Sequence, residues 1–168
     1  MIIKYFNDDN LNSKEIDEVV TRVKAIIINS NNEILLGYSH KTYQFPGGHL
    51  ESEDLNTGLE RELKEELGVD IKVIEKPFME VIEYSSNYRN TGKNRENDIY
   101  YFIINEYIKP DMANANLDEN EIKGNYTPVY IPLNDVENIL ICSILDNPIN
   151  KIIVSEMLEV LKNIKSML

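Results

Sequence analysis

The sequence lacks several features that would place it in a specialised class. Its single cysteine, Cys142, leaves no partner for a disulfide within the chain, and the surrounding run NILICSIL predicts a buried core residue. No apolar run approaches the roughly 18 residues that cross a membrane. The first residues are soon followed by acidic ones and do not resemble a signal peptide. We therefore expect a cytoplasmic protein with no membrane partner.

Positive charge is also scarce. Seventeen Lys and Arg residues stand against 29 Asp and Glu residues, which gives a formal net charge of −12. This balance argues against a nucleic-acid partner, because binding a phosphate backbone needs clustered Lys and Arg. A phosphorylated small molecule stays open, provided that a metal ion screens the repulsion.

The chain shows no internal repeat, low-complexity segment or linker, so we expect residues 1–168 to form one domain. Alternating β-branched residues predict a strand over 18–30, and a turn joins it to a second strand over 33–39 as a hairpin. The other expected elements are strands over 71–85, 97–108 and 127–133 and helices over 54–67, 133–141 and 147–168. This order predicts an α/β fold with a mixed β-sheet flanked by helices.

The stretch FPGGHLESEDLNTGLERELKEELGVD, residues 45–70, combines a Gly-Gly corner with an acidic helix. Asp54 is a suitable N-cap, and Gly68 follows the last helical residue. An apolar stripe for packing is formed by Leu55, Leu59, Leu63 and Leu67. The helix is thus expected to pack with one side and to present its carboxylates beside that side.

Three of these carboxylates, Glu62, Glu65 and Glu66, fall within about 100° on the helix surface. Like charges at this spacing repel by a few tenths of a kcal/mol per pair, so stability alone does not favour them. Hard divalent cations bind several carboxylate oxygens and a backbone carbonyl, which the glycines at 47–48 could present. The carboxylates alone fit a metal site and a solvated acidic helix face about equally well.

The same residues resemble the signature of the Nudix hydrolase family of MutT-like enzymes, which is called the Nudix box. Its pattern is G-x5-E-x7-R-E-U-x-E-E-x-G-U, where U is aliphatic. Every specified position matches, from Gly47 through Glu53 and Arg61 to Val69. The family usually counts from the second glycine of the pair, whereas here the count starts at the first. The loop before Glu53 is therefore one residue shorter than usual. The resemblance implies the family's α/β/α sandwich.

The resemblance also implies a reaction, hydrolysis of the pyrophosphate bond in a nucleoside diphosphate linked to another moiety X. Water would attack phosphorus with the help of Mg²⁺ or Mn²⁺. The implied metal ligands are Glu62, Glu65 and Glu66, with the carbonyl of Gly47 or Gly48. Glu53 would assist the metal-bound water or orient the helix, and Arg61 would hold a box carboxylate through a bidentate pair.

Several residues outside the helix are further candidates. The general base is either a box glutamate such as Glu62 or an acidic residue of a later loop, Glu119 or Glu121. A local basic group of Arg89, Lys93 and Arg95, together with His49, could contact substrate phosphates. Among the tyrosines Tyr43, Tyr84 and Tyr88 could stack on a base, although strand tyrosines usually serve packing.

Two other functions fit a Nudix-like chain. The first is a non-catalytic nucleotide-binding or sensing module, which would be favoured by a missing box carboxylate, and none is missing. The second is a diphosphate isomerase, which would need a cysteine near the site. The substrate itself stays open among several nucleotide derivatives, and a homodimer is an open alternative because dimers are common in the family.

Overall fold

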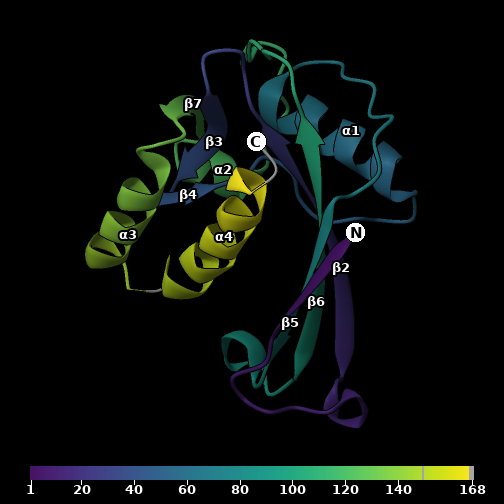
Figure 1. The fold of residues 1–168 in the computed structure, drawn as a ribbon. Coiled ribbons are helices and arrows are strands. Elements are labelled where there is room, and N and C mark those ends of the chain that lie inside the picture. Colours follow the sequence, from purple (N-terminus) through teal and green to yellow (C-terminus); the bar gives the residue numbers. More distant parts are fainter. Residues whose placement is uncertain (149, 167–168) are drawn as a thin grey trace.

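Two β-sheets lie between helices in the computed structural model, which describes residues 1–148 and 150–166 (Figure 1). The strands are β1 (Ile2–Phe6), β2 (Glu18–Ile27), β3 (Glu33–Ser39), β4 (Thr42–Gln44), β5 (Met79–Ser85), β6 (Arg95–Ile104) and β7 (Thr127–Pro132). The helices are α1 (Leu55–Leu67), α2 (Glu119–Lys123), α3 (Val136–Asp146) and α4 (Asn150–Lys165), with 3-10 turns at Ser13–Glu15 and Tyr88–Asn90.

The strands form a four-stranded mixed sheet in the order β1-β5-β6-β2 and a three-stranded antiparallel sheet in the order β4-β3-β7. The predicted hairpin of 18–30 with 33–39 is wrong. β2 instead pairs in parallel with β6, and it meets the next strand only at the bridge Ile28–Ile34. Residues 46–50 occupy the other edge of β2. There the carbonyl of Gly48 accepts a hydrogen bond from the amide of Val23 at 3.0 Å.

Strand β2 has apolar cores on both of its faces. Val23, Ala25 and Ile27 pack with the leucines of α1, whereas Ile26 packs with residues of α3 and α4. Burying one apolar side chain of this size stabilises the fold by about 1.5–3 kcal/mol, so the helices on both faces pack stably against the sheet. The predicted α/β/α sandwich with a mixed sheet flanked by helices is confirmed, although the strands divide into two sheets.

Helix α1 begins and ends where the sequence predicts. The side chain of Asp54 accepts from the amides of Asn56 and Thr57, each at 3.1 Å, which satisfies two N–H groups of the first turn. Gly68 lies in the left-handed region with φ 70° and ends the helix. Both contacts are local in sequence, which explains why the pattern is readable.

Other expectations needed correction. The strand expected over 71–85 begins only at Met79, directly after Pro77 and Phe78, and β1 was not predicted. The loop after residue 108 contains the short helix α2. Cys142 is exposed rather than buried, because α3 turns Val136, Leu140 and Ser143 inward and leaves Cys142 on the opposite side.

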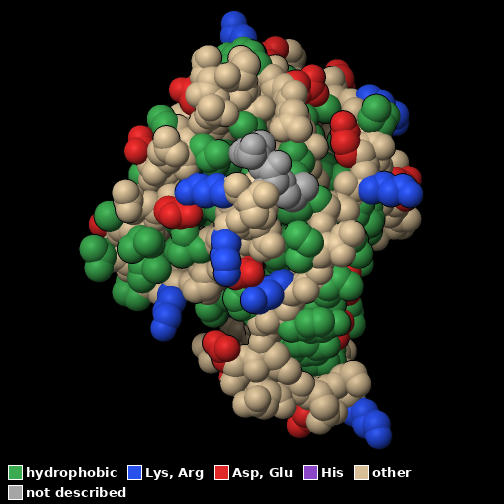
Figure 2. Space-filling view, viewed as in Figure 1, with side chains coloured by type: hydrophobic (Ala, Val, Ile, Leu, Met, Phe, Trp, Pro, Cys, Tyr) green, Lys and Arg blue, Asp and Glu red, His purple; other side chains and the backbone are tan. Residues whose placement is uncertain are grey.

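The four-stranded sheet extends beyond the helices, and hydrophobic side chains gather on that extension (Figure 2). Its exposed hydrophobic residues include Ile3, Tyr5 and Val19. Within the described residues, no helix is both long enough and apolar enough to span a membrane.

Candidate active site

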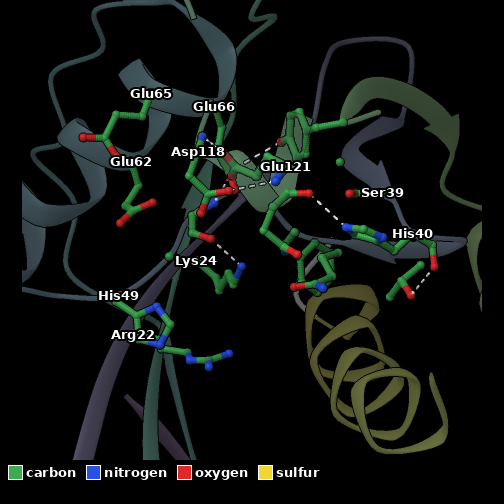
Figure 3. A pocket seen from close by; sticks show the side chains of 18 of the residues that line it. Arg22, Lys24, Ser39, His40, His49, Glu62, Glu65, Glu66, Asp118 and Glu121 are labelled. Carbon is green, nitrogen blue, oxygen red and sulfur yellow. Dashed lines mark hydrogen bonds between the residues drawn. The ribbon is translucent and has the colours of Figure 1, made fainter. Parts of the chain in front are cut away.

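A cavity of about 560 Å³ lies between α1, strand β2, the β3–β4 hairpin, the loop before β6 and helix α2. Figure 3 shows Glu62 and Glu65 on one side of it and Ser39 and His40 on the other. The lining includes every candidate site residue of the sequence analysis except Glu53, Glu119, Lys93 and two of the tyrosines, Tyr43 and Tyr84. Segments far apart in sequence thus converge on the residues of the Nudix box.

One side of the cavity, which we call the acidic wall, consists of Glu62, Glu65 and Glu66 of α1. Arg61 ties this wall together. Its guanidinium donates to Glu62 at 2.9 Å and to Glu65 at 3.1 Å. It also makes two bonds to Glu53, at 2.9 and 3.1 Å, and one to the carbonyl of His49 at 2.7 Å. Arg61 therefore links the helix to the loop that precedes it.

Glu66 is the buried carboxylate of the acidic wall. It accepts from the amide of Gly47 at 2.8 Å and from the hydroxyl of Tyr126 at 3.1 Å. Burial raises the pKa of Glu66 to about 7, against the opposing effects of Lys24 and the Gly47 amide. Burial and the neighbouring Glu66 also raise the pKa of Tyr126, which keeps its hydroxyl a donor.

The Gly-Gly corner approaches both β2 and α1 closely. Gly47 has φ 123°, and a Cβ there would lie 2.2 Å from the carbonyl oxygen of Val23. A Cβ at Gly48 would lie 2.3 Å from a carboxylate oxygen of Glu62. The carbonyl of Gly47 accepts from the ammonium of Lys24, so the predicted metal-ligand carbonyl already has a hydrogen-bond partner.

The residues of the acidic wall suit a divalent cation in their chemistry. Carboxylate oxygens beside a backbone carbonyl are the ligands of Mg²⁺ and Mn²⁺. Burial raises the pKa of Glu62 as well as that of Glu66, which shows that nearby positive charge does not fully offset their desolvation. Within residues 1–148 and 150–166, however, no three His, Cys, Asp or Glu side chains are already grouped as a metal site. Arg61 contacts one oxygen of Glu62 and one of Glu65, so the second oxygen of each carboxylate could bind a cation.

The two loop candidates for the general base differ in position. Glu121 lines the cavity, where its carboxylate accepts from the amide of Asp118 at 2.7 Å and caps α2. Glu119 is exposed and lies 3.6 Å from Lys123. Geometry therefore favours Glu121 of the two. Glu53 is held by Arg61 outside the cavity lining, which fits an orienting role.

Another part of the cavity lining, which we call the cationic wall, consists of Arg22, Lys24, Arg89 and Arg95. The guanidinium of Arg95 lies 3.8 Å from the ring centroid of Tyr88 and pairs with Glu18 at 2.8 Å. Lys93, from the same loop, is exposed and does not line the cavity.

His49 lies in the cavity lining near this wall. Burial, followed by Arg22, Lys24, Arg95 and Arg89, lowers the pKa of His49 to about 4. The imidazole is therefore neutral at physiological pH, consistent with a substrate contact rather than with a charged partner. The other histidine, His40, also lines the cavity, where Nε2 lies 2.9 Å from the carbonyl of Asn120.

The sequence analysis missed three residues of the site, Arg22, Lys24 and Tyr126. A signal for the first two was present, because these charged residues alternate with Val23 and Ala25 next to the apolar run of residues 25–28. Tyr126 gave no signal of its own. Of the three proposed stacking tyrosines only Tyr88 lines the cavity, and Cys142 does not.

Two solved structures are similar to this chain, and the first of them supports the fold. The NUDIX domain of Shewanella oneidensis NrtR, described in complex with ADP ribose, is 18% identical, with 77% of this chain and 83% of that chain covered and a TM-score of 0.51. The MutT protein of Methanosarcina mazei Go1 is 17% identical, with coverage of 72% and 82% and a TM-score of 0.49. A search of curated proteins gives no match.

The family assignment rests on the sequence itself. The family model of the NUDIX domain matches residues 19–145, about three quarters of the chain. This range contains α1, the Gly-Gly corner and the whole cavity lining. The chain therefore belongs to the NUDIX domain family, and it is a Nudix pyrophosphohydrolase.

Proposed function

We propose that this protein hydrolyses the pyrophosphate bond of a nucleoside diphosphate linked to another moiety, with a divalent cation held on the acidic wall. The observation that carries the proposal is the convergence of Glu62, Glu65 and Glu66 on a cavity that the cationic wall also lines. Such a cavity suits a metal-bound pyrophosphate, because each wall meets charge of the opposite sign.

The residues divide the reaction between them. The carboxylates of Glu62, Glu65 and Glu66 would hold Mg²⁺ or Mn²⁺. The carbonyl of Gly47 would be a further ligand after its hydrogen bond from Lys24 is broken. The cation, when bound, supplies polarisation of the phosphoryl oxygens and a lower pKa for water. The hydrogen bond between Arg61 and Glu53 holds the helix and the loop before it in position beside the cavity.

Glu121 is the proposed general base. Water attacks one phosphorus, its proton passes to the carboxylate of Glu121, and the bond from that phosphorus to the bridging oxygen breaks. The bridging oxygen leaves with the second phosphate. Glu121 lies on a short helix at the cavity, so its carboxylate needs only a small movement to reach a water in the site.

We further propose that residues 1–168 form a single Nudix domain in the cytoplasm, with a nucleotide-derived small molecule as its partner. Both apolar cores share β2, which supports one cooperative unit. The absence of a nucleic-acid partner stays a prediction, and a homodimer stays open.

The test is product release from a panel of nucleoside diphosphate derivatives, ADP-ribose included, with and without Mg²⁺. We expect metal-dependent turnover that falls at least 1,000-fold in the double variant Glu65→Gln, Glu66→Gln. The matched control is Glu60→Gln on the same helix, because Glu60 lies outside the cavity and accepts from the amide of Val73 at 2.8 Å. Nucleotide binding without turnover would instead favour the non-catalytic module.

A further inference from the structure

Arg22 lies on the floor of the cavity, in the middle of a core strand. Side chains of β2 alternate, so Val23 and Ala25 pack beneath α1 while Arg22 and Lys24 point to the other face. Two cations are thus placed beside the substrate cavity by strand geometry. In Figure 3 the side chain of Lys24 lies between those of Glu66 and Arg22.

Arg22 differs from the other arginines in its partners. The chain has four arginines. Arg61 pairs with three glutamates and Arg95 with Glu18, while Arg89 is exposed and lies 5.2 Å from the ring centroid of Tyr88. For Arg22, the buried Nε has no hydrogen-bond partner, and the ion pairs within residues 1–148 and 150–166 do not include it. A buried N–H without an acceptor costs free energy, so it calls for an explanation such as an acceptor on a bound ligand or a water molecule.

The carboxylates behind Arg22 do not supply that acceptor. Glu83 of β5 and Glu156 of α4 interact with Arg22 only at a distance, and their side chains hydrogen-bond to each other. A hydrogen bond between two carboxyl groups requires a proton on one of them, so the pair carries less negative charge than two free carboxylates. The neighbouring cation, Lys24, is itself bound to the carbonyl of Gly47.

The charges around the cavity indicate what the missing acceptor is. Arg22, Lys24, Arg89 and Arg95 come from two separate segments, and all four line the cavity. The glutamates of the acidic wall line the same cavity. An anion with several oxygens between a cation-loaded acidic wall and this cationic wall would satisfy both sides, and a pyrophosphate has that chemistry.

We propose that Arg22 is a substrate-binding residue that donates hydrogen bonds from Nε and a terminal nitrogen to oxygens of the substrate's pyrophosphate, on the side away from the acidic wall. This inference rests on the proposed function, because it takes the pyrophosphate of that reaction as the ligand. Arginine suits the role better than lysine, since its planar fork presents two parallel N–H groups to phosphate oxygens.

The test measures binding of methylene diphosphonate, an analogue of pyrophosphate that cannot be hydrolysed, by titration calorimetry in Mg²⁺. Arg22→Gln should weaken binding at least 10-fold, and Arg22→Lys should lie between this variant and the wild type. The matched control is Lys93→Ala, which removes one positive charge from a nearby exposed position outside the cavity and should change affinity less than twofold.

Thermal unfolding separates binding from a structural role. Arg22→Gln should unfold at the wild-type temperature or above, because it removes a buried donor that the free protein leaves unsatisfied. A lower unfolding temperature with unchanged affinity would overturn the proposal and make Arg22 a structural residue. If Arg22→Gln does not fold, the intermediate affinity expected of Arg22→Lys carries the test alone.

The outcomes also distinguish this inference from the proposed function. A wild type that hydrolyses a panel substrate while Arg22→Gln binds the analogue equally well overturns the inference alone. Arg22-dependent binding in a protein that hydrolyses nothing overturns hydrolysis and supports the inference. A wild type that does not bind the analogue at all overturns the inference as well.

Discussion

The two walls of the cavity are built in different ways. On the acidic wall, the partners of Arg61 lie within 12 residues of it in sequence. The cationic wall joins Arg22 and Lys24 of β2 to Arg89 and Arg95, which follow more than 60 residues later. One wall is thus specified by a helix and its preceding loop, and the other by the way in which distant strands pair.

The largest of the three effects below is expected at the proposed general base, Glu121, which belongs to neither wall. Glu121→Gln should lower kcat about 100-fold with little change in KM, because it removes the proton acceptor but keeps an oxygen to cap α2. Glu119→Gln, two residues away and exposed, should keep wild-type turnover. The measurement is steady-state kinetics on the substrate found in the panel. Full activity of the Glu121 variant would mean that the general base is one of the glutamates of α1.

A smaller effect is expected from loosening the acidic wall itself. Arg61→Lys keeps the positive charge but loses the fork that joins Glu53, Glu62 and Glu65. We expect about a 10-fold rise in the Mg²⁺ concentration that gives half-maximal activity, because residues behind metal ligands typically affect metal affinity on this scale. Lys64→Arg is the control, since Lys64 pairs with Asp70 away from the cavity. Equal Mg²⁺ curves for both variants would show that Arg61 does not organise the ligands.

The smallest effect concerns the carboxyl pair behind the cationic wall. Burial, and after it Glu83, raises the pKa of Glu156 well above its ordinary value, against the opposing effects of Lys24 and Arg22. The folded protein therefore keeps a proton that the unfolded chain releases, so this group's contribution to stability is full below about pH 4.5 and falls as pH rises through the folded pKa.

Glu156→Gln removes that titration. We expect its free energy of unfolding to exceed that of the wild type by about 1 kcal/mol at pH 8 and by less at pH 5. Urea unfolding at both pH values measures the difference. The control is Glu159→Gln on the same helix, whose partner Lys4 lies 3.4 Å away at the surface. A wild type that gains stability over the variant between pH 5 and 8 would contradict the raised pKa.

The sequence predicted much of one wall and little of the other. Helix α1 was readable because its cap, its leucine stripe and its box carboxylates all depend on neighbours within a few turns. Arg22 and Lys24 were treated as ordinary alternating strand residues. Their role depends on residues 46–50 taking the edge of β2, which placed the Gly-Gly corner against that strand. No local pattern encodes this pairing.

The errors in predicting the fold have the same cause, because local sequence patterns do not encode how distant segments pair and pack. The hairpin prediction used the turn at 30–32, yet β2 and β3 enter different sheets. Cys142 was expected in the core because its neighbours are apolar, although a short helix packs only one side. Helix α4 likewise buries Leu161 and Ile164 and leaves Ile152 exposed.

The parallel pairing of β2 with β6 has a consequence for folding kinetics. Its first contact, Glu18 with Arg95, closes a loop across 77 residues, whereas the caps of α1 need contacts only two or three residues apart. Long loop closures are slow because entropy is lost before contacts compensate it. The acidic helix should therefore form before the cations of β2 reach it. In refolding experiments, the moment at which the chain first binds a pyrophosphate analogue would mark the zipping of these two strands.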